Sequence, residues 1–64
     1  MISEKLKKLR AERGLTQEAA AREIGISRTA LESYETGRRV PKDAIKVKIA
    51  NYYNADLVEI FFKT

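Results

Sequence analysis

Glycines at positions 14, 25 and 37 each follow a short stretch in which apolar residues recur with helical spacing. Thr16 and Ser27, residue types that favour the first position of a helix, come soon after two of these glycines. The result is a series of short helices, and short helices are marginal in water unless they pack on one another. With 64 residues, the chain is long enough for one small domain in which they do so.

The same signals predict five helices and an all-α fold. The expected helices are Ser3 to Arg13, Gln17 to Ile24, Arg28 to Glu35, a fourth from just after Val40-Pro41 to about Tyr53, and Leu57 to about Phe62. The expected N-caps are Ser3, Thr16, Ser27 and Asp56. Neither alternating strand patterns nor internal repeats occur, so residues 1–64 are predicted to form a single domain.

Composition excludes several classes of function. The chain has no cysteine and no histidine, which removes disulfides, thiolate metal sites and the usual general base. No apolar run approaches the roughly 18 residues that span a membrane, and no glycine-rich loop suited to cradling phosphate is present. We therefore expect a soluble, cytoplasmic protein that is not an enzyme and has no cofactor, small-molecule ligand or membrane contact.

Charge is distributed unevenly around a net value of +4. Residues 1–13 have a net charge of +3 and residues 38–48 have +4, whereas the segment between them, residues 14–37, has −2. Two basic flanks around a central segment suit a polyanion that touches the protein at separated places. A lysine-rich solvated surface is the alternative.

The second and third predicted helices, residues 17–35, have the layout of a helix-turn-helix unit. Ala20 and Ala21 are small enough to let the next helix cross closely, and Gly25 suits the turn. On the third helix, Ala30, Leu31 and Tyr34 share one face. The opposite face is expected to carry polar side chains, namely Arg28, Thr29, Glu32, Ser33 and Thr36. In such units the second helix enters the major groove of DNA.

Four stretches from Leu6 to Phe61 make this pattern more specific: "LKKLRAERGLTQEAAA", "IGIS", "YETGRRVP" and "IKVKIANYYNADLVEIF". They resemble the lambda-repressor/Cro-type helix-turn-helix proteins, often called the XRE family. The resemblance implies a compact five-helix domain that binds double-stranded DNA. It also implies a regulator of transcription that is bacterial or phage-encoded and associated with the nucleoid.

Site residues follow from the resemblance position by position. Base contacts are implied at Arg28, Thr29 and Ser33, with Glu32 as a further one. Phosphate contacts are implied at Arg10, Thr16, Gln17, Thr36, Arg38, Arg39 and Lys42. The family also pairs Arg10 with Glu35. Glu32 has two alternative roles, which are to orient Arg28 from one helical turn away or to repel non-specific backbone contact.

Four positions depart from the family pattern, two of which, Asp43 and Lys46, replace usually apolar residues in the fourth helix. Ala20 replaces a usual leucine, and Tyr34 is expected to fill the space that this leaves. Val58 replaces a usual polar residue and lies one turn from Phe62, which gives the last helix, residues 56–62, a second apolar face. We expect a symmetric homodimer through Val58, Phe61 and Phe62. The alternative is that Phe62 folds back over a frayed end.

Two functions are compatible with these features. The first is a sequence-specific regulator, expected to be a repressor, that binds a pseudo-palindromic operator as a dimer. The second is an antitoxin or anti-repressor module whose main partner is another protein. The basic flanks and the small polar face of the third helix favour the first.

Overall fold

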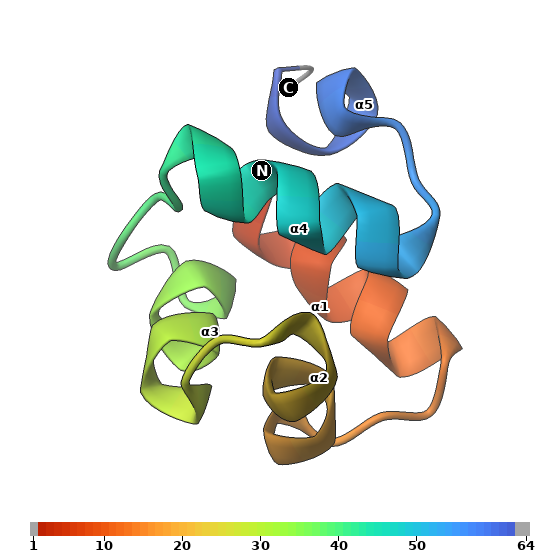
Figure 1. Cartoon of the computed structure of the whole chain (residues 1–64), viewed down its shortest axis with the longest axis vertical. Helices are drawn as coiled ribbons and strands as arrows, with labels where there is room; N and C mark the ends of the chain where they lie inside the picture. Colours follow the sequence, from red (N-terminus) through yellow and green to blue (C-terminus); the bar gives the residue numbers. More distant parts are fainter. Residues whose placement is uncertain (1, 63–64) are drawn as a thin grey trace.

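The computed structural model describes residues 2–62, which form five helices. They are α1 (Ile2–Glu12), α2 (Gln17–Ile24), α3 (Arg28–Glu35), α4 (Asp43–Tyr53) and α5 (Leu57–Phe61). Figure 1 shows α2 and α3 at one end of the molecule and α5 at the other, with α1 and α4 between them. No strand occurs in the described part of the chain, so the predicted all-α, five-helix fold is confirmed.

The bounds of α2 and α3 agree with the prediction because local capping bonds set them. Thr16 Oγ1 accepts the N–H of Ala19 at 3.0 Å, and Ser27 Oγ accepts that of Ala30 at 3.0 Å. Gly25 then ends α2 in the left-handed conformation, at φ 92°. Asp56 caps α5 in the same manner, accepting the N–H of Val58 at 2.8 Å.

The bounds of α1 and α5 differ slightly from the prediction. Because α1 already begins at Ile2, Ser3 lies inside the helix and does not cap it, so that prediction was wrong. The same helix ends at Glu12, one residue earlier than expected. At the other end of the chain, Phe62 is the C-cap of α5 and not part of the helix.

The buried side chains form two clusters. The larger comprises Leu6, Ile24, Tyr34, Ile49, Ala50, Tyr53, Ile60 and Phe61. The smaller joins α2 to α3 and comprises Ala20, Ala21 and Leu31, with Leu15 and Ile26 packed against it. The prediction that Tyr34 fills the space beside Ala20 was wrong. Leu31, which is fully buried in the smaller cluster, lies there, while Tyr34 belongs to the larger one.

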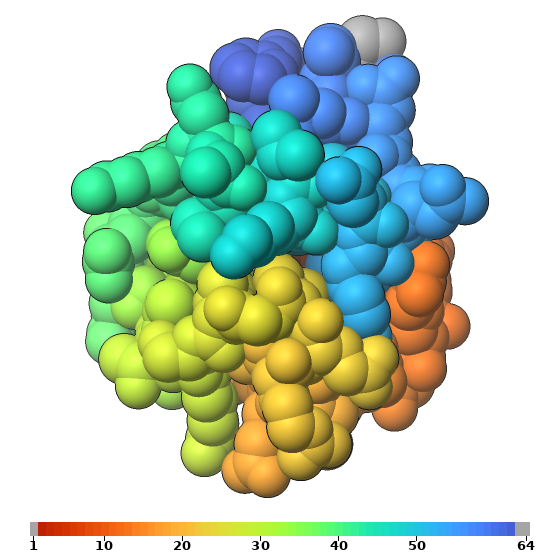
Figure 2. Space-filling view, in the orientation of Figure 1, coloured from red at the N-terminus to blue at the C-terminus, as the bar shows by residue number. Residues whose placement is uncertain are grey.

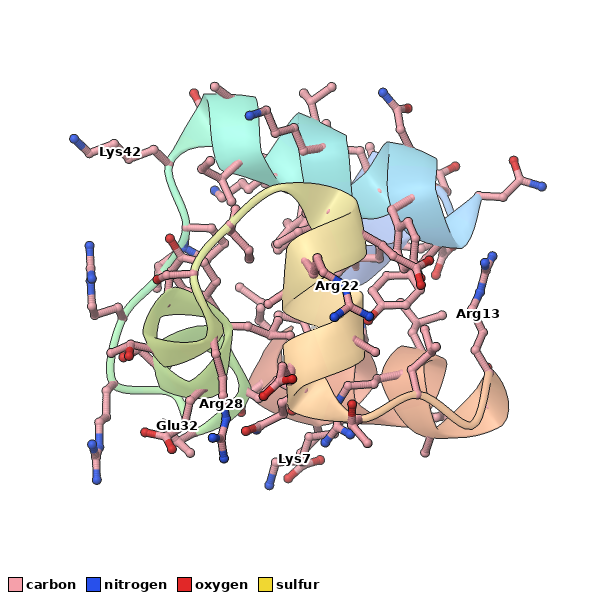
Figure 3. All side chains as sticks on the ribbon, turned by 60° about the horizontal axis from the view of Figure 1, so that its bottom comes forward. Lys7, Arg13, Arg22, Arg28, Glu32 and Lys42 are labelled. Atoms are coloured by element: carbon pink, nitrogen blue, oxygen red, sulfur yellow. The ribbon has the colours of Figure 1, made fainter. Side chains whose placement is uncertain are left out.

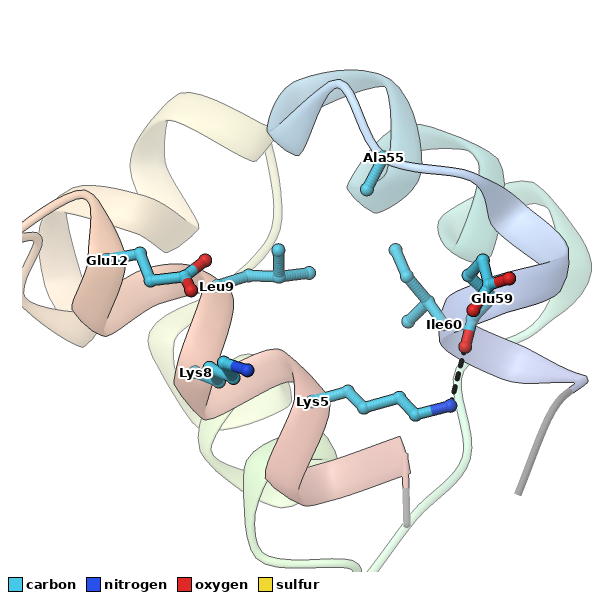
Figure 4. Close-up of a pocket in the computed structure, with 7 residues that line it drawn as sticks. All are labelled: Lys5, Lys8, Leu9, Glu12, Ala55, Glu59 and Ile60. Carbon is cyan, nitrogen blue, oxygen red and sulfur yellow. Dashed lines mark hydrogen bonds between the residues drawn. The ribbon is translucent and has the colours of Figure 1, made fainter.

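Helix α5 divides its apolar side chains between the core and the surface. Phe61 is 6% exposed and packs in the larger cluster, so of the three residues predicted at a dimer interface it presents the least surface to a second copy. Val58 and Phe62 are 49% and 60% exposed. Lys5 of α1 holds this helix by donating from Nζ to the backbone carbonyl of Glu59 at 2.6 Å (Figure 4).

In the space-filling view of Figure 2, the middle of the visible face is formed by α4 and, below it, by α2 and the turn that follows α2. None of the helices in residues 2–62 has the length and apolar character that crossing a membrane requires.

The hydroxyl of Tyr53 is buried and has no hydrogen-bond partner among residues 2–62. An unpaired buried hydroxyl is destabilising, so we expect Tyr53→Phe to raise the free energy of unfolding by about 1 kcal/mol at pH 7. Burial also raises the pKa of Tyr53 to about 12, whereas the unfolded residue titrates near 10. The parent should therefore lose stability as pH rises from about 10 to 12, and the variant should lose less. Urea unfolding at pH 7 and pH 11 measures both effects, and a variant no more stable than the parent would contradict the first.

Candidate nucleic-acid interface

Helices α2 and α3 pack closely because the residues between them are small. Ala20 is fully buried and Ala21 is 1% exposed, and the fully buried side chain of Leu31 packs against both. The turn at residues 25–27 connects the two helices, with Ile26 contacting both core clusters. This packing holds the opposite side of α3 toward solvent.

The exposed side of α3 carries Arg28, Thr29 and Glu32, which we call the recognition face. Arg28 and Thr29 are exposed, and the Glu32 side chain is 46% exposed. Arg28 and Glu32 project from α3 in the same direction in Figure 3. Three of the four predicted base-contacting residues thus lie together on one surface.

Ser33 does not share that surface. It was predicted on the exposed polar side of α3, but it is 8% exposed and buried. The cause is the chain after the helix, which turns back over it: the Ser33 carbonyl accepts the backbone N–H of Arg38 at 3.0 Å and that of Arg39 at 3.3 Å. Ser33 therefore anchors the following loop and presents little side-chain surface to a ligand.

A buried ion pair connects α1 to the end of α3. Arg10 Nε lies 2.8 Å from Glu35 Oε2 and 3.1 Å from Oε1, and Arg10 Nη1 donates to the carbonyl of Leu15 at 2.8 Å. Glu35 is fully buried, whereas the Arg10 side chain is 22% exposed. The hydrogen bond to Glu35 raises the pKa of Arg10. The pair implied by the family resemblance is thereby confirmed.

Gln17 extends this network to the start of α2. Its Nε2 donates to Glu35 Oε1 at 3.1 Å, so part of the amide that was expected to reach a phosphate is already engaged. The remaining amide N–H stays available, as do the backbone N–H groups of Gln17 and Glu18, because the first N–H groups of a helix have no acceptor within it and Thr16 caps only that of Ala19. Thr16 uses its hydroxyl oxygen as the cap.

An open notch lies at the N-terminal end of α2, lined by Arg10, Thr16, Gln17, Glu18 and Arg28. Sequence reasoning singled out four of these five residues as DNA contacts. The fifth, Glu18, lies in the first turn of α2, where its carboxylate complements the helix dipole. Arg28 and the helix N-terminus favour an anion in the notch, whereas Glu18 opposes one and Arg10 is already paired with Glu35.

The loop of residues 36–42 follows α3 and presents its basic side chains to solvent; we call it the basic loop. Gly37 adopts φ 79°, a left-handed conformation that ends α3 and sends the chain back across it. Arg38, Arg39 and Lys42 are all exposed. Thr36 is exposed too, but its hydroxyl donates to the carbonyl of Glu32 at 2.9 Å and so has no free proton for a phosphate.

Glu32 pairs with a different arginine from the one expected. Sequence spacing suggested Arg28, one turn earlier on α3, as its neighbour. In the structure its carboxylate lies 4.0 Å from Arg38 Nη1, so the partner comes from the basic loop. The turn at Gly37 is what brings Arg38 there.

A family model described as a helix-turn-helix domain matches residues 2–60. The chain belongs to the XRE-type helix-turn-helix family. Its members are DNA-binding regulators of transcription, which points to a role in binding and not in catalysis.

Curated relatives support this placement. The transcriptional repressor RstR of cryptic phage CTXphi from Vibrio cholerae is 37% identical over 60 residues, which cover 94% of this chain and 54% of the repressor. The uncharacterized HTH-type transcriptional regulator YqaE from Bacillus subtilis is 40% identical over 57 residues, or 89% of this chain and 49% of YqaE. The chain thus spans about half the length of these two relatives.

A third relative is more similar in size. It is an uncharacterized HTH-type transcriptional regulator from Methanocaldococcus jannaschii, 35% identical over 60 residues that cover 94% of this chain and 91% of the relative. The similarity therefore includes a protein that is almost fully accounted for by the five-helix domain.

Proposed function

We propose that this chain is a sequence-specific DNA-binding regulator that represses transcription as a homodimer on a pseudo-palindromic operator. The observation that carries the proposal is that Arg28 of the recognition face lines the notch at the start of α2, while Glu32 of the same face lies 4.0 Å from Arg38 of the basic loop. Residues 1–64 would act as a single DNA-binding domain on chromosomal or phage DNA in the cytoplasm.

In this proposal α3 enters the major groove and its side chains read base edges. Arg28 is suited to a bidentate contact with O6 and N7 of guanine, and Thr29 to contact with a thymine methyl group. The Glu32 carboxylate accepts a hydrogen bond from a cytosine amino group. Ser33 acts indirectly, through the backbone bonds that hold the basic loop in place.

Phosphate groups would be bound on both sides of α3. The notch provides Arg10, Gln17 and the exposed N–H groups of α2, and the capping residue Thr16 lies at its edge. On the other side are the exposed basic residues of the loop, namely Arg38, Arg39 and Lys42. The Thr36 hydroxyl reaches a phosphate in this proposal only after releasing the Glu32 carbonyl. Such contacts set the position and orientation of the protein and most of its salt dependence.

The dimer would form through the exposed apolar side of α5. Val58 and Phe62 provide 49% and 60% exposed side chains, and Val47 on the neighbouring helix α4 is 47% exposed. Lys46 Nζ lies 4.9 Å from the ring centroid of Phe62, which places a basic side chain beside this apolar surface. Two-fold pairing would set two recognition helices roughly 34 Å apart, one turn of DNA.

Selection of bound sites from random duplexes tests the proposed function. We expect an enriched, two-fold symmetric consensus, and a Kd on the best site that rises steeply with salt concentration. Failure to enrich any site would contradict the proposal. Retention of another protein by the immobilised chain in the absence of DNA would then favour the protein-interaction module.

Two arginines distinguish base reading from phosphate binding. We expect Arg28→Ala to weaken binding to the selected operator by about 10- to 100-fold and to remove the base preference at one position of each half-site. Arg39→Ala should weaken binding to all sequences alike and lower the salt slope by about one. Fluorescence anisotropy titrations on the operator and on single-base variants measure both effects. Equal loss on all sequences with Arg28→Ala would show that this arginine contacts only phosphate.

A further inference from the structure

Glu32 places a negative charge on the face of α3 that the proposed function turns toward DNA. Its carboxylate lies 4.0 Å from Arg38 Nη1, and the two side chains are 46% and 73% exposed. Arg28 lies one helical turn earlier and points in the same direction (Figure 3). The acidic group of the recognition face therefore lies beside Arg38 of the basic loop and one helical turn from Arg28, in a chain of net charge +4.

A carboxylate in this place affects different DNA sequences in opposite ways. Against base edges that present acceptors, it is repelled, and it loses its hydration without gaining a partner. Against the N4 amino group of cytosine it accepts a hydrogen bond. Such a group therefore penalises wrong sequences more than it strengthens the correct one.

Arg38 connects this effect to the phosphate backbone. Its main chain is held by the bond from its N–H to the carbonyl of Ser33, so its exposed side chain is the part that is free to move. While the guanidinium stays beside Glu32, the two charges offset each other and attract a phosphate weakly. An exposed pair at this distance is weak enough to exchange for a phosphate contact.

We propose, on the basis of the proposed function, that Glu32 determines the specificity of this protein mainly by exclusion. On non-operator DNA it repels the groove and, as a nearby negative charge, weakens the attraction of Arg38 for a phosphate. On the operator it accepts a hydrogen bond from a cytosine amino group, and Arg38 moves to a neighbouring phosphate. Glu32 is thus a specificity-determining residue that acts in part through Arg38.

Glu32→Gln tests this inference because it removes the charge and keeps the shape of the side chain. We expect binding to a scrambled duplex to tighten about tenfold and the salt slope on that duplex to steepen by about one, since Arg38 gains a phosphate. Binding to the operator selected with the parent should not become tighter. The specificity ratio, which is the Kd for the scrambled duplex divided by the Kd for the operator, should therefore fall about tenfold or more. A repeated selection should lose the preference for cytosine at one position of each half-site.

Glu18→Gln is the matched control. Glu18 lies on α2 at the edge of the notch, so its removal changes the charge of the same DNA-binding side without touching the pair with Arg38. We expect it to tighten binding to both duplexes alike and to leave their ratio within threefold of that of the parent. Circular dichroism melting verifies that both variants keep the parent fold.

Two results would overturn the inference. The first is a ratio of scrambled to operator Kd for Glu32→Gln that stays within threefold of the parent value. The second is a fall in that ratio with Glu18→Gln as large as the fall with Glu32→Gln. Failure of the proposed function looks different, because then the parent chain itself would enrich no operator. A parent with a clear operator and an unchanged Glu32→Gln ratio would leave the DNA-binding function standing and remove only the role of Glu32.

Discussion

Arg10→Met should unfold much of this protein at room temperature. The substitution leaves the Glu35 carboxylate fully buried with only Gln17 as a side-chain donor, and breaking a buried pair in this way costs about 3 kcal/mol or more. Domains of this length rarely have more than about 3–5 kcal/mol of total stability. Thermal melting followed by far-ultraviolet circular dichroism should show a Tm lowered by roughly 15 °C or more.

Two further variants identify the cause of that loss. Arg10→Met combined with Glu35→Leu removes both charges and should recover most of the lost stability, because a buried pair is often replaceable by apolar side chains. Arg22→Met removes an exposed arginine of α2 and should change the free energy of unfolding by about 0.5 kcal/mol or less. If the double variant were no more stable than Arg10→Met, the uncompensated carboxylate would not be the cause.

Val58→Lys combined with Phe62→Lys should produce a folded monomer that binds the operator about 100-fold more weakly than the parent. Both side chains are exposed, so the substitutions leave the core intact. Two charged groups facing their symmetry mates would prevent association, and the gain from binding two half-sites together would be lost. The added positive charge by itself favours DNA binding, so a loss of affinity can be assigned to the lost dimer.

Sedimentation equilibrium measures the oligomeric state, and titrations on full and half operators measure binding. We expect the double variant to bind a half operator at least as tightly as the parent at concentrations where both are monomeric. Ala11→Lys adds a lysine at an exposed position of α1 and serves as the control. It should sediment with the same oligomeric state as the parent. A double variant that sediments and binds the full operator like the parent would exclude α5 as the interface.

Local signals explain which parts of the fold were predictable. The bounds of α2 and α3 follow from hydroxyl caps and left-handed glycines, which act over three or four residues. The pairing of Arg10 with Glu35 joins residues that are distant in sequence, and only the family resemblance indicated it.

The errors share a different physical origin. Ser33 lies at the boundary between the two faces of α3, and the returning loop decides that it is buried. The same loop gives Glu32 its partner Arg38, which no spacing along α3 would indicate. Phe61 and Phe62 are adjacent in sequence, and tertiary packing places the first in the core and the second in solvent. Helical periodicity alone does not resolve such positions.

The contacts of α1 have a consequence for the length of the operator. This helix is bound to α3 through Arg10 and Glu35, and to α5 through Lys5 and the carbonyl of Glu59. Lys5 and Arg10 lie five residues apart in α1, which is roughly 7.5 Å along the helix, so α1 would act as a short spacer between the part that reads DNA and the part that would join two copies. The number of base pairs tolerated between half-sites would then depend on how rigidly α1 holds these two contacts. A protein with a loosened Lys5 end should accept operators with a wider range of spacings.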